Sequence, residues 1–102
     1  MYQTIREYQT NQHSVAEILL QDEKDFVPLI SKAPGFREYT CSENGNGVVT
    51  STSLFANRSD GEKFNTLATN WVNEHLSTLL PTAPRVIVGE VRTHATGKVL
   101  AS

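Results

Sequence analysis

The stretch Ser59–Leu80, SDGEKFNTLATNWVNEHLSTLL, decides the fold because it carries the longest uninterrupted helix signal in the chain. On a wheel of about 100° per residue its apolar side chains fall on one broad stripe. The members of this stripe are Phe64, Leu67, Ala68, Trp71, Val72, Leu76 and Leu79. Ser59 and Glu62 have the spacing of a helix N-cap with a capping box, and Pro81 closes the helix. We therefore predict an amphipathic helix over Ser59–Leu80.

An earlier helix is expected between Ser14 and Ala33. Ser14 and Glu17 repeat the capping-box spacing, and apolar residues then recur at helical intervals. Pro28 lies inside this pattern, where it removes one intrahelical hydrogen bond and crowds the preceding turn. We therefore expect a kink or a break near Val27, and an end to the helix by Ala33 because Pro-Gly follows.

Four segments read as strands, because each is rich in β-branched or aromatic residues: 2–9, 36–43, 48–56 and 85–94. Asn44–Gly47 between the second and third segments is a strong hairpin signal. The order is β-α-β-β-α-β, and right-handed crossovers place both helices on one face of a four-stranded antiparallel sheet. This is an α+β, ferredoxin-like arrangement. We expect residues 1–102 to form a single domain, with 95–102 as a frayed tail.

The strands predict a second apolar surface. Val48 and Leu54 alternate with Val49 and Phe55, so both faces of the sheet carry apolar side chains. A sheet face without helices is usually polar, and an apolar one needs a cover. We expect that cover to be a second copy of the chain, packed sheet against sheet in a homodimer. The alternative is a monomer in which neighbouring polar residues, such as Thr50, keep this face hydrated.

The amino-acid composition argues against several classes of binding partner. The 102 residues have a net charge of −2 and only scattered lysines and arginines, which argues against nucleic acid or an anionic membrane surface as partner. Cys41 is the only cysteine, so no intramolecular disulfide or thiolate cluster is expected, and three isolated histidines make no metal signature. No cofactor motif is found. The first residues lack an apolar signal core, so we expect a cytoplasmic protein.

Two ionisable residues interrupt the apolar helix faces and are the candidate catalytic groups. His75 lies one turn beyond Trp71, and Asp22 falls within the stripe of the earlier helix. A buried carboxylate needs a partner, so our hypothesis is that Asp22 and His75 share a pocket beside the Trp71 indole. The imidazole would act there as a base or hydrogen-bond donor. Tyr39 on the second strand is a further candidate ligand-binding residue.

Each of these residues also has a purely structural interpretation. His75 can be a core histidine bonded to a backbone carbonyl, and Asp22 can reach solvent where Pro28 disturbs the packing. Trp71 and Tyr39 can be ordinary packed aromatic residues. Cys41 has no His or Lys near it in sequence that would lower its pKa, so a nucleophilic role is not expected.

Two segments carry a family resemblance: VPLISKAPGFREY, from residue 27, and GNGVVTSTSLFANRSDGEKFNTLATNWVNEHLSTLLPTAPRVIVGEV, from residue 45. They resemble antibiotic biosynthesis monooxygenase-like proteins of the dimeric α+β barrel superfamily. The resemblance implies a homodimer of ferredoxin-like protomers, each with a cavity between helices and sheet. Enzymes of the superfamily include cofactor-free monooxygenases and haem-degrading monooxygenases. The haem-degrading relatives place an Asn on the first strand, where this chain has Thr4, Ile5 and Arg6.

Three functions follow as alternatives. The first is a protein that binds a small apolar or aromatic molecule between helices and sheet, with cofactor-independent monooxygenation as its activity. The second is a haem-binding or haem-degrading monooxygenase. The third is a non-enzymatic dimerisation module whose interior is filled. A cavity of at least ~300 Å³ beside His75 would favour a ligand site over the third alternative.

Overall fold

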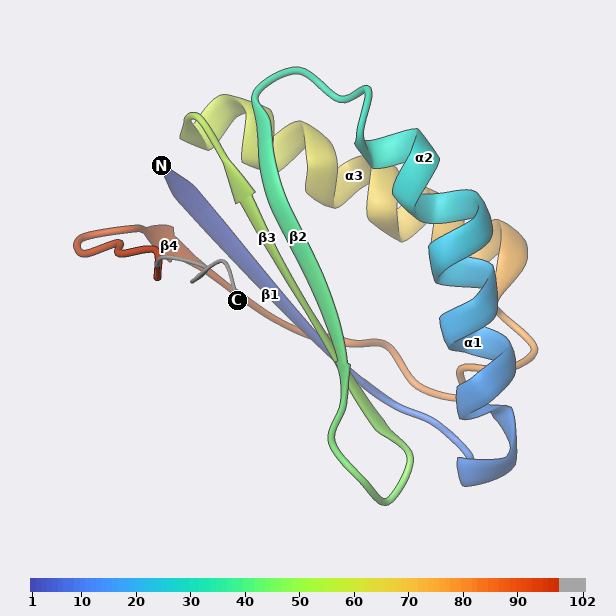
Figure 1. Cartoon of the computed structure of the whole chain (residues 1–102). Coiled ribbons are helices and arrows are strands. Elements are labelled where there is room, and N and C mark those ends of the chain that lie inside the picture. Colours follow the sequence, from blue (N-terminus) through green and yellow to red (C-terminus); the bar gives the residue numbers. More distant parts are fainter. Residues whose placement is uncertain (98–102) are drawn as a thin grey trace, which may run out of the picture.

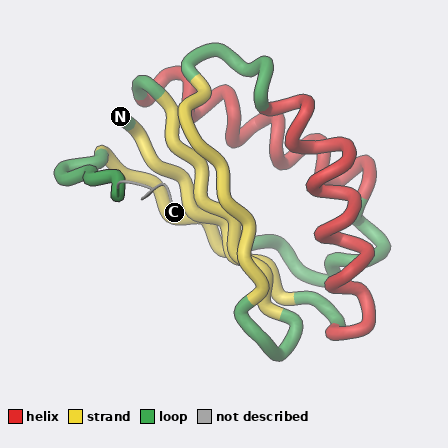
Figure 2. Tube along the Cα trace, viewed as in Figure 1, coloured by secondary structure: helices red, strands yellow, loops and turns green. Residues whose placement is uncertain are grey.

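The computed structural model describes residues 1–97 and has the predicted ferredoxin-like fold, with helices on one face of a four-stranded antiparallel sheet (Figure 1 and Figure 2). The strand order is β2-β3-β1-β4. The helical elements are η1 (Gln12–Ser14), α1 (Val15–Gln21), η2 (Asp22–Phe26), α2 (Val27–Ile30) and α3 (Arg58–His75). The strands are β1 (Tyr2–Gln9), β2 (Phe36–Glu43), β3 (Val48–Phe55) and β4 (Arg85–Glu90).

The predicted disturbance before Pro28 takes the form of a π-helical turn. The turn, η2, joins α1 to α2, and the Val27 N–H donates to the Asp22 carbonyl five residues back. Pro28 follows at the first turn of α2, where a missing N–H costs little. The helical stretch therefore continues to Ile30, but its register shifts at Asp22. Single π-turns of this kind are frequent at functional sites.

The cap predicted for α3 is wrong by two residues. Asn57 is the N-cap, and its Oδ1 accepts a hydrogen bond of 2.9 Å from the Asp60 N–H. Ser59 lies within the first turn, and Glu62 pairs with Arg58 rather than closing a capping box. The helix also ends at His75, five residues before Leu80, and residues 76–79 form turns. Ser14 is the N-cap of α1 as predicted, but it makes no side-chain capping bond.

The hairpin and helix termini meet at one end of the sheet. Asn46 and the glycines of the Asn44–Gly47 loop have positive φ, as the hairpin signal requires. The Gly47 carbonyl accepts from the Thr10 N–H at 2.8 Å, and a Cβ on Gly47 would lie 2.0 Å from the Thr10 carbonyl oxygen. Thr10 also donates its hydroxyl to the Leu79 carbonyl at 3.0 Å. These bonds hold the turns that follow α3 against the end of β1 and the hairpin.

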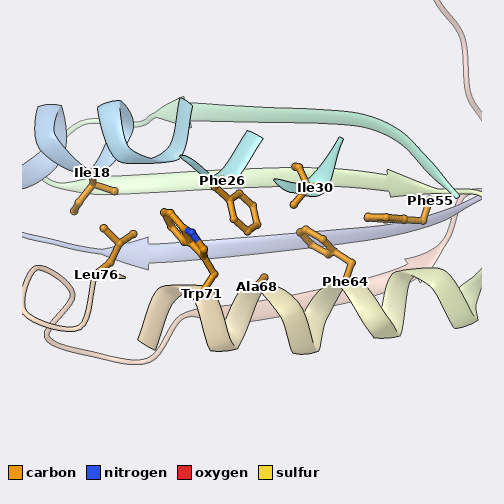
Figure 3. Close-up of a cluster of buried hydrophobic side chains, with 8 residues drawn as sticks. All are labelled: Ile18, Phe26, Ile30, Phe55, Phe64, Ala68, Trp71 and Leu76. Carbon is orange, nitrogen blue, oxygen red and sulfur yellow. The ribbon is translucent and has the colours of Figure 1, made fainter. Parts of the chain in front are cut away.

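The core lies between the helices and the sheet, and its side chains come from η2, α2, α3 and β3 as well as α1 (Figure 3). Phe26 from η2 contacts both Trp71 and Phe64 of α3, with ring centroids 4.9 and 6.0 Å apart. Gly61 lets α3 approach the sheet closely, because a Cβ there would meet the Tyr2 ring at 2.4 Å. The fully buried anchors of this core are Phe55 and Ile30.

The last strand is shorter than predicted: β4 ends at Glu90, and residues 91–94 are not part of it. The chain after β4 turns onto the helix-free side of the sheet (Figure 1). There His94 Nε2 lies 3.9 Å from Glu38 Oε2, on the strand at the opposite edge of the sheet from β4. Residues 91–94 therefore cross this face near Leu54, which pairs with Glu38 and is only 7% exposed.

The helix-free face is thus covered in part by the chain's own C-terminal segment. Residues 95–97 of the expected frayed tail have no regular secondary structure, and 98–102 lie outside the described residues. Within residues 1–97, every helix is too short or too polar to cross a membrane.

Candidate functional site

A small cavity of about 30 Å³ lies between the helices and the sheet. Its apolar wall includes the aromatic rings of Phe26, Phe64 and Trp71. Its polar groups come from η2 and three strands: Asp22, Tyr39, Cys41, Arg6, Tyr8 and Ser51. A volume of this size holds about one water molecule, so the enclosed space alone is far smaller than a ligand pocket.

Asp22 and Tyr39 form the polar centre of the cavity. The Tyr39 hydroxyl donates to Asp22 Oδ1 over 2.5 Å, at the short end of the range for such bonds. Asp22 is the first residue of the π-turn, where the register of the helical stretch shifts, and it lines the cavity. Burial raises the pKa of Asp22, and the hydrogen bonds from Tyr39 and Cys41 offset this only in part. Asp22 therefore holds its proton more readily than an exposed carboxyl does.

The thiol of Cys41 and the phenol of Tyr39 are kept neutral in the cavity. Burial raises the pKa of the Cys41 thiol to about 11, and the neighbouring Asp22 charge adds to the effect. Burial also raises the pKa of Tyr39, again with the Asp22 carboxylate as the next cause. Cys41 is therefore poorly suited to act as a nucleophile, as its sequence context predicts.

Arg6 enters the cavity from the middle of β1 and is 3% exposed. Its Nε donates to Tyr8 Oη at 2.8 Å, and its Nη2 donates to Thr69 Oγ1 at 3.3 Å. Burial raises the pKa of Tyr8, and the nearby Arg6 charge works against that shift. Arg6 and Tyr8 thus form a second polar pair in the cavity, separate from Asp22 and Tyr39.

An open groove of about 490 Å³ adjoins the cavity. It runs between the C-terminal part of α3, the loop 81–84 and Val86 of β4. Three residues line both spaces and form the wall between them: Arg6, Val72 and Leu80. The groove has the volume of a small-molecule site, and the cavity lies directly behind it.

The structure does not bring His75 to the candidate site. His75 is exposed, lines neither the cavity nor the groove, and makes no ion pair with Asp22 within residues 1–97. Its ring stacks on the outer side of Trp71 with centroids 4.8 Å apart, and its Nδ1 lies 3.0 Å from the Trp71 carbonyl oxygen. Because a carbonyl oxygen only accepts, Nδ1 carries the proton.

The expected pairing of Asp22 with His75 is therefore replaced by the pairing of Asp22 with Tyr39. The physical reason lies at the end of α3. His75 is its last residue, and Leu76 turns inward at the cap with φ −122° and 3% exposure, so it takes the inner position expected for His75. Trp71, Asp22 and Tyr39 line one cavity, and their role in ligand binding stays a prediction.

Arg6, Tyr8 and Val72 are site residues that the sequence analysis did not select. A signal was available for the first two: strand alternation places Arg6 and Tyr8 on the same face as Thr4, which is buried beneath α3. The groove itself had no sequence signal, because it depends on where α3 ends and how the loop 81–84 returns to β4.

Comparison with known proteins identifies the fold. No model of a known protein family matches the chain, and no curated protein sequence matches it. Solved structures do match. A protein of unknown function from Nitrosomonas europaea has a TM-score of 0.76 and 13% identity, covering 96% of this chain and 95% of its own. A monooxygenase from Streptomyces coelicolor, solved in complex with the ligand nanaomycin D, has a TM-score of 0.74 and 16% identity, covering 95% and 92%.

A third similar structure is a haem degrader from Mycobacterium tuberculosis with two haems bound in its active site. It has a TM-score of 0.73 and 11% identity, and the match covers 94% of this chain and all of its own. At these identities the likeness concerns the fold. The fold is that of antibiotic biosynthesis monooxygenase-like proteins, as the sequence resemblance predicts.

Proposed function

We propose that this chain, which has the fold of antibiotic biosynthesis monooxygenase-like proteins, binds a small flat apolar or aromatic molecule in the groove and the cavity behind it. One observation carries the proposal. The groove of about 490 Å³ shares Arg6, Val72 and Leu80 with the aromatic cavity. An apolar space with a few convergent polar groups is the usual form of a ligand site.

The division between groove and cavity determines how a ligand sits. The enclosed cavity of about 30 Å³ admits no ring system as it stands, which is what the non-enzymatic alternative predicts for the interior. The groove supplies the missing volume. In our proposal the ligand's ring occupies the groove, and a rotation of Val72 and Leu80 gives one edge of the ring access to the cavity. Both of these side chains are half-buried.

Cofactor-independent monooxygenation is the activity we propose to test. Asp22, with its raised pKa and its bond from Tyr39, is the group in the cavity suited to take a proton from a phenolic substrate. The electrons would come from the substrate and the oxidant would be O₂. Oxygen uptake with a dihydroxynaphthalene, lost in Asp22→Asn while binding is retained, would support this activity. Binding without any oxygen uptake would restrict the protein to a binding role.

Haem binding is the weaker alternative for this chain, because its residues do not fit the group. His75 is outside both spaces and uses Nδ1 on the Trp71 carbonyl oxygen. The side chains of β1 that face the helices are Tyr2, Thr4, Arg6 and Tyr8, none of which is an Asn. A Soret band that appears and saturates on titration with haemin would contradict this assessment.

We also propose a homodimer. Residues Val86, Ile87 and Val88 of β4 are 44%, 46% and 47% exposed, so both faces of this edge strand present apolar side chains. Ile87 pairs with Ile5 on the helix-free face, beyond the part that residues 91–94 cross. A second copy packed on this part of the helix-free face would cover Ile5 and Ile87.

The ligand site is tested by filling the groove without disturbing the core. Ala83 lies in the exposed loop at the groove, and Ala83→Phe should place a ring in the space proposed for the ligand. The control is Ala16→Phe, an exposed alanine on α1 that lines no part of the groove or cavity. Flat aromatic compounds are screened by the rise in melting temperature that a bound ligand causes.

We expect compounds that stabilise the wild type and Ala16→Phe to lose their effect on Ala83→Phe. Equal stabilisation of all three proteins would place binding outside the groove. A screen in which no aromatic compound raises the melting temperature would contradict the proposed function.

A further inference from the structure

Arg6 is a buried cation that forms no ion pair with a carboxylate of residues 1–97. It lies in the middle of β1, on the face that α3 covers, and is 3% exposed. A guanidinium keeps its charge under all ordinary conditions, and a buried charge is normally paired with an opposite one. The partners of Arg6 therefore decide whether this charge is satisfied within the fold.

Within residues 1–97, the side-chain hydrogen bonds of the Arg6 guanidinium go only to neutral groups. Nε donates to the Tyr8 hydroxyl and Nη2 donates to the Thr69 hydroxyl, while the guanidinium carbon lies 5.7 Å from the Tyr8 ring centroid. No carboxylate lies within 4.0 Å of Arg6 in residues 1–97, and Nη1 makes no hydrogen bond there. Asp22, the acid of the cavity, bonds to Tyr39 instead.

Arg6 borders the groove as well as the cavity. Arg6 lines the groove together with the polar side chains of Thr69, Asn73 and Ser77, and no acidic residue belongs to the described lining. An anion entering the groove thus meets one cation and several neutral hydrogen-bonding groups, without repulsion from a carboxylate. A planar guanidinium with free N–H groups matches the geometry of a carboxylate, which it can bind through two parallel hydrogen bonds.

From this arrangement we propose that Arg6 binds the carboxylate of an aromatic acid in the groove. The inference rests on the proposed function, because it names the class of ligand for the same site. The carboxylate meets Arg6 at the inner end of the groove, and the ring lies outward against Val72, Pro81 and Val86. Arg6 is then the residue that distinguishes an acid from a neutral molecule of the same shape.

The test compares 2-naphthoate with 2-naphthalenemethanol, a neutral compound with the same ring system. Binding is followed by the fluorescence of Trp71, which is the only tryptophan in the chain and lines the cavity behind the groove. Bonds to a charged partner in a desolvated site favour the acid by about ten- to a hundredfold in Kd. This wild-type comparison needs no substitution and is independent of any effect on folding.

Three variants assign the preference to Arg6. Arg6→Gln should bring the two affinities together, and Arg6→Lys should keep part of the preference because the charge remains. Arg85→Gln is the matched control: it removes an exposed arginine of β4 that pairs with Glu7 in the sheet and does not line the groove, so the preference should persist.

The outcomes separate this inference from the proposed function. Equal affinity of the wild type for the acid and the alcohol overturns the inference but not the proposed function. The site would then bind the aromatic ring without distinguishing a charged ligand from a neutral one. A preference that survives Arg6→Gln also overturns the inference, whatever the result for Arg85→Gln. Binding of neither compound overturns the proposed function and the inference with it.

Discussion

Asp22 is a half-buried acid of the cavity whose pKa is shifted by its surroundings. Burial raises its pKa, while the short bond from the Tyr39 hydroxyl lowers it only in part. A folded-state pKa above the unfolded value means that the native state binds the proton more tightly than the unfolded chain. The contribution of Asp22 to stability is therefore complete below its unfolded pKa, near ~3.9, and is lost as the pH rises through its folded pKa.

Asp22→Asn should remove this pH dependence. An Asn keeps an oxygen that accepts from Tyr39 but has no proton to lose, so the variant should gain stability relative to the wild type as the pH rises from 4 to 8. Urea unfolding at several pH values measures the difference. Asp25→Asn, an exposed acid of the same π-turn, is the control and should show no such trend. A difference between wild type and Asp22→Asn that does not vary with pH would contradict the assignment.

Cys41 should react slowly with thiol reagents. Its pKa of about 11 leaves little thiolate at pH 8, and the higher nucleophilicity of a basic thiolate compensates only partly. We expect modification by a disulfide reagent to be roughly tenfold or more slower in the folded protein than in the urea-unfolded chain, which is the internal control. Equal rates in the two states would show that the thiol is neither buried nor influenced by Asp22.

At the residue scale, the sequence predicts the interior positions of Asp22, Trp71 and Tyr39 because apolar periodicity marks the inner face of each element. It fails for His75, since a helical wheel assumes that the helix continues past that residue. It also overlooks Arg6, since a charged residue on a strand ordinarily points to solvent. The apolar stripe of a helix and the alternation along a strand predict which side chains face inward. The hydrogen-bond partner of each side chain depends on tertiary packing.

At the scale of single elements, the start of α3 gives a direct contrast between two candidate caps. Asn57 Oδ1 accepts from the Asp60 N–H, whereas Ser59 lies inside the first turn and is exposed. Asn57→Ala should lower the free energy of unfolding by about 1 kcal/mol, because it leaves a helix N–H without its cap. Ser59→Ala, the matched control, should be nearly neutral. A larger loss in Ser59→Ala than in Asn57→Ala would restore the sequence-based assignment.

The ends of the helices and strands are harder to predict from the sequence than the presence of these elements. Both helices and all four strands are present where their patterns predict them. The ends differ because competing signals overlap: Asn57 and Ser59 are both good caps, and Leu76 and Leu79 extend an apolar stripe beyond the last helical residue. The disturbance at Pro28 is predictable from its missing N–H. The sequence has no signal for a π-turn that begins at Asp22 and ends at the core residue Phe26.

At the scale of the whole molecule, the two faces of the sheet are covered by different parts of the chain. The helices cover β1, β2 and β3, and residues 91–94 cross the helix-free face near Leu54 (Figure 1). The apolar side chains of β4 remain exposed on both faces. The sequence predicts an apolar helix-free face from alternation alone. It does not predict the C-terminal crossing, because residues 91–94 continue the strand pattern of 85–90 in the sequence.

The exposed part of β4 leads to a prediction of oligomeric state. The wild type should have twice the chain mass of 11.3 kDa in light scattering at micromolar concentration. Ile87→Glu should shift the protein to the monomer, because it places a charge in the proposed interface. Leu20→Glu is the control, since Leu20 is 62% exposed on α1 and belongs to the opposite side of the molecule. A monomeric wild type, or a dimer unaffected by Ile87→Glu, would contradict the proposed interface.

The central claim is that the groove and the cavity behind it form one small-molecule site. A nitrogen–proton NMR titration of the labelled protein with 2-naphthoate tests it most directly. We expect saturable shifts of the Thr69, Ser77, Ala83 and Val86 amides and of the Trp71 indole, because these groups line the groove or cavity. Amides of Thr50 and Thr52 on the helix-free face should stay unchanged. Shifts confined to that face, or no shifts at all, would contradict the claim.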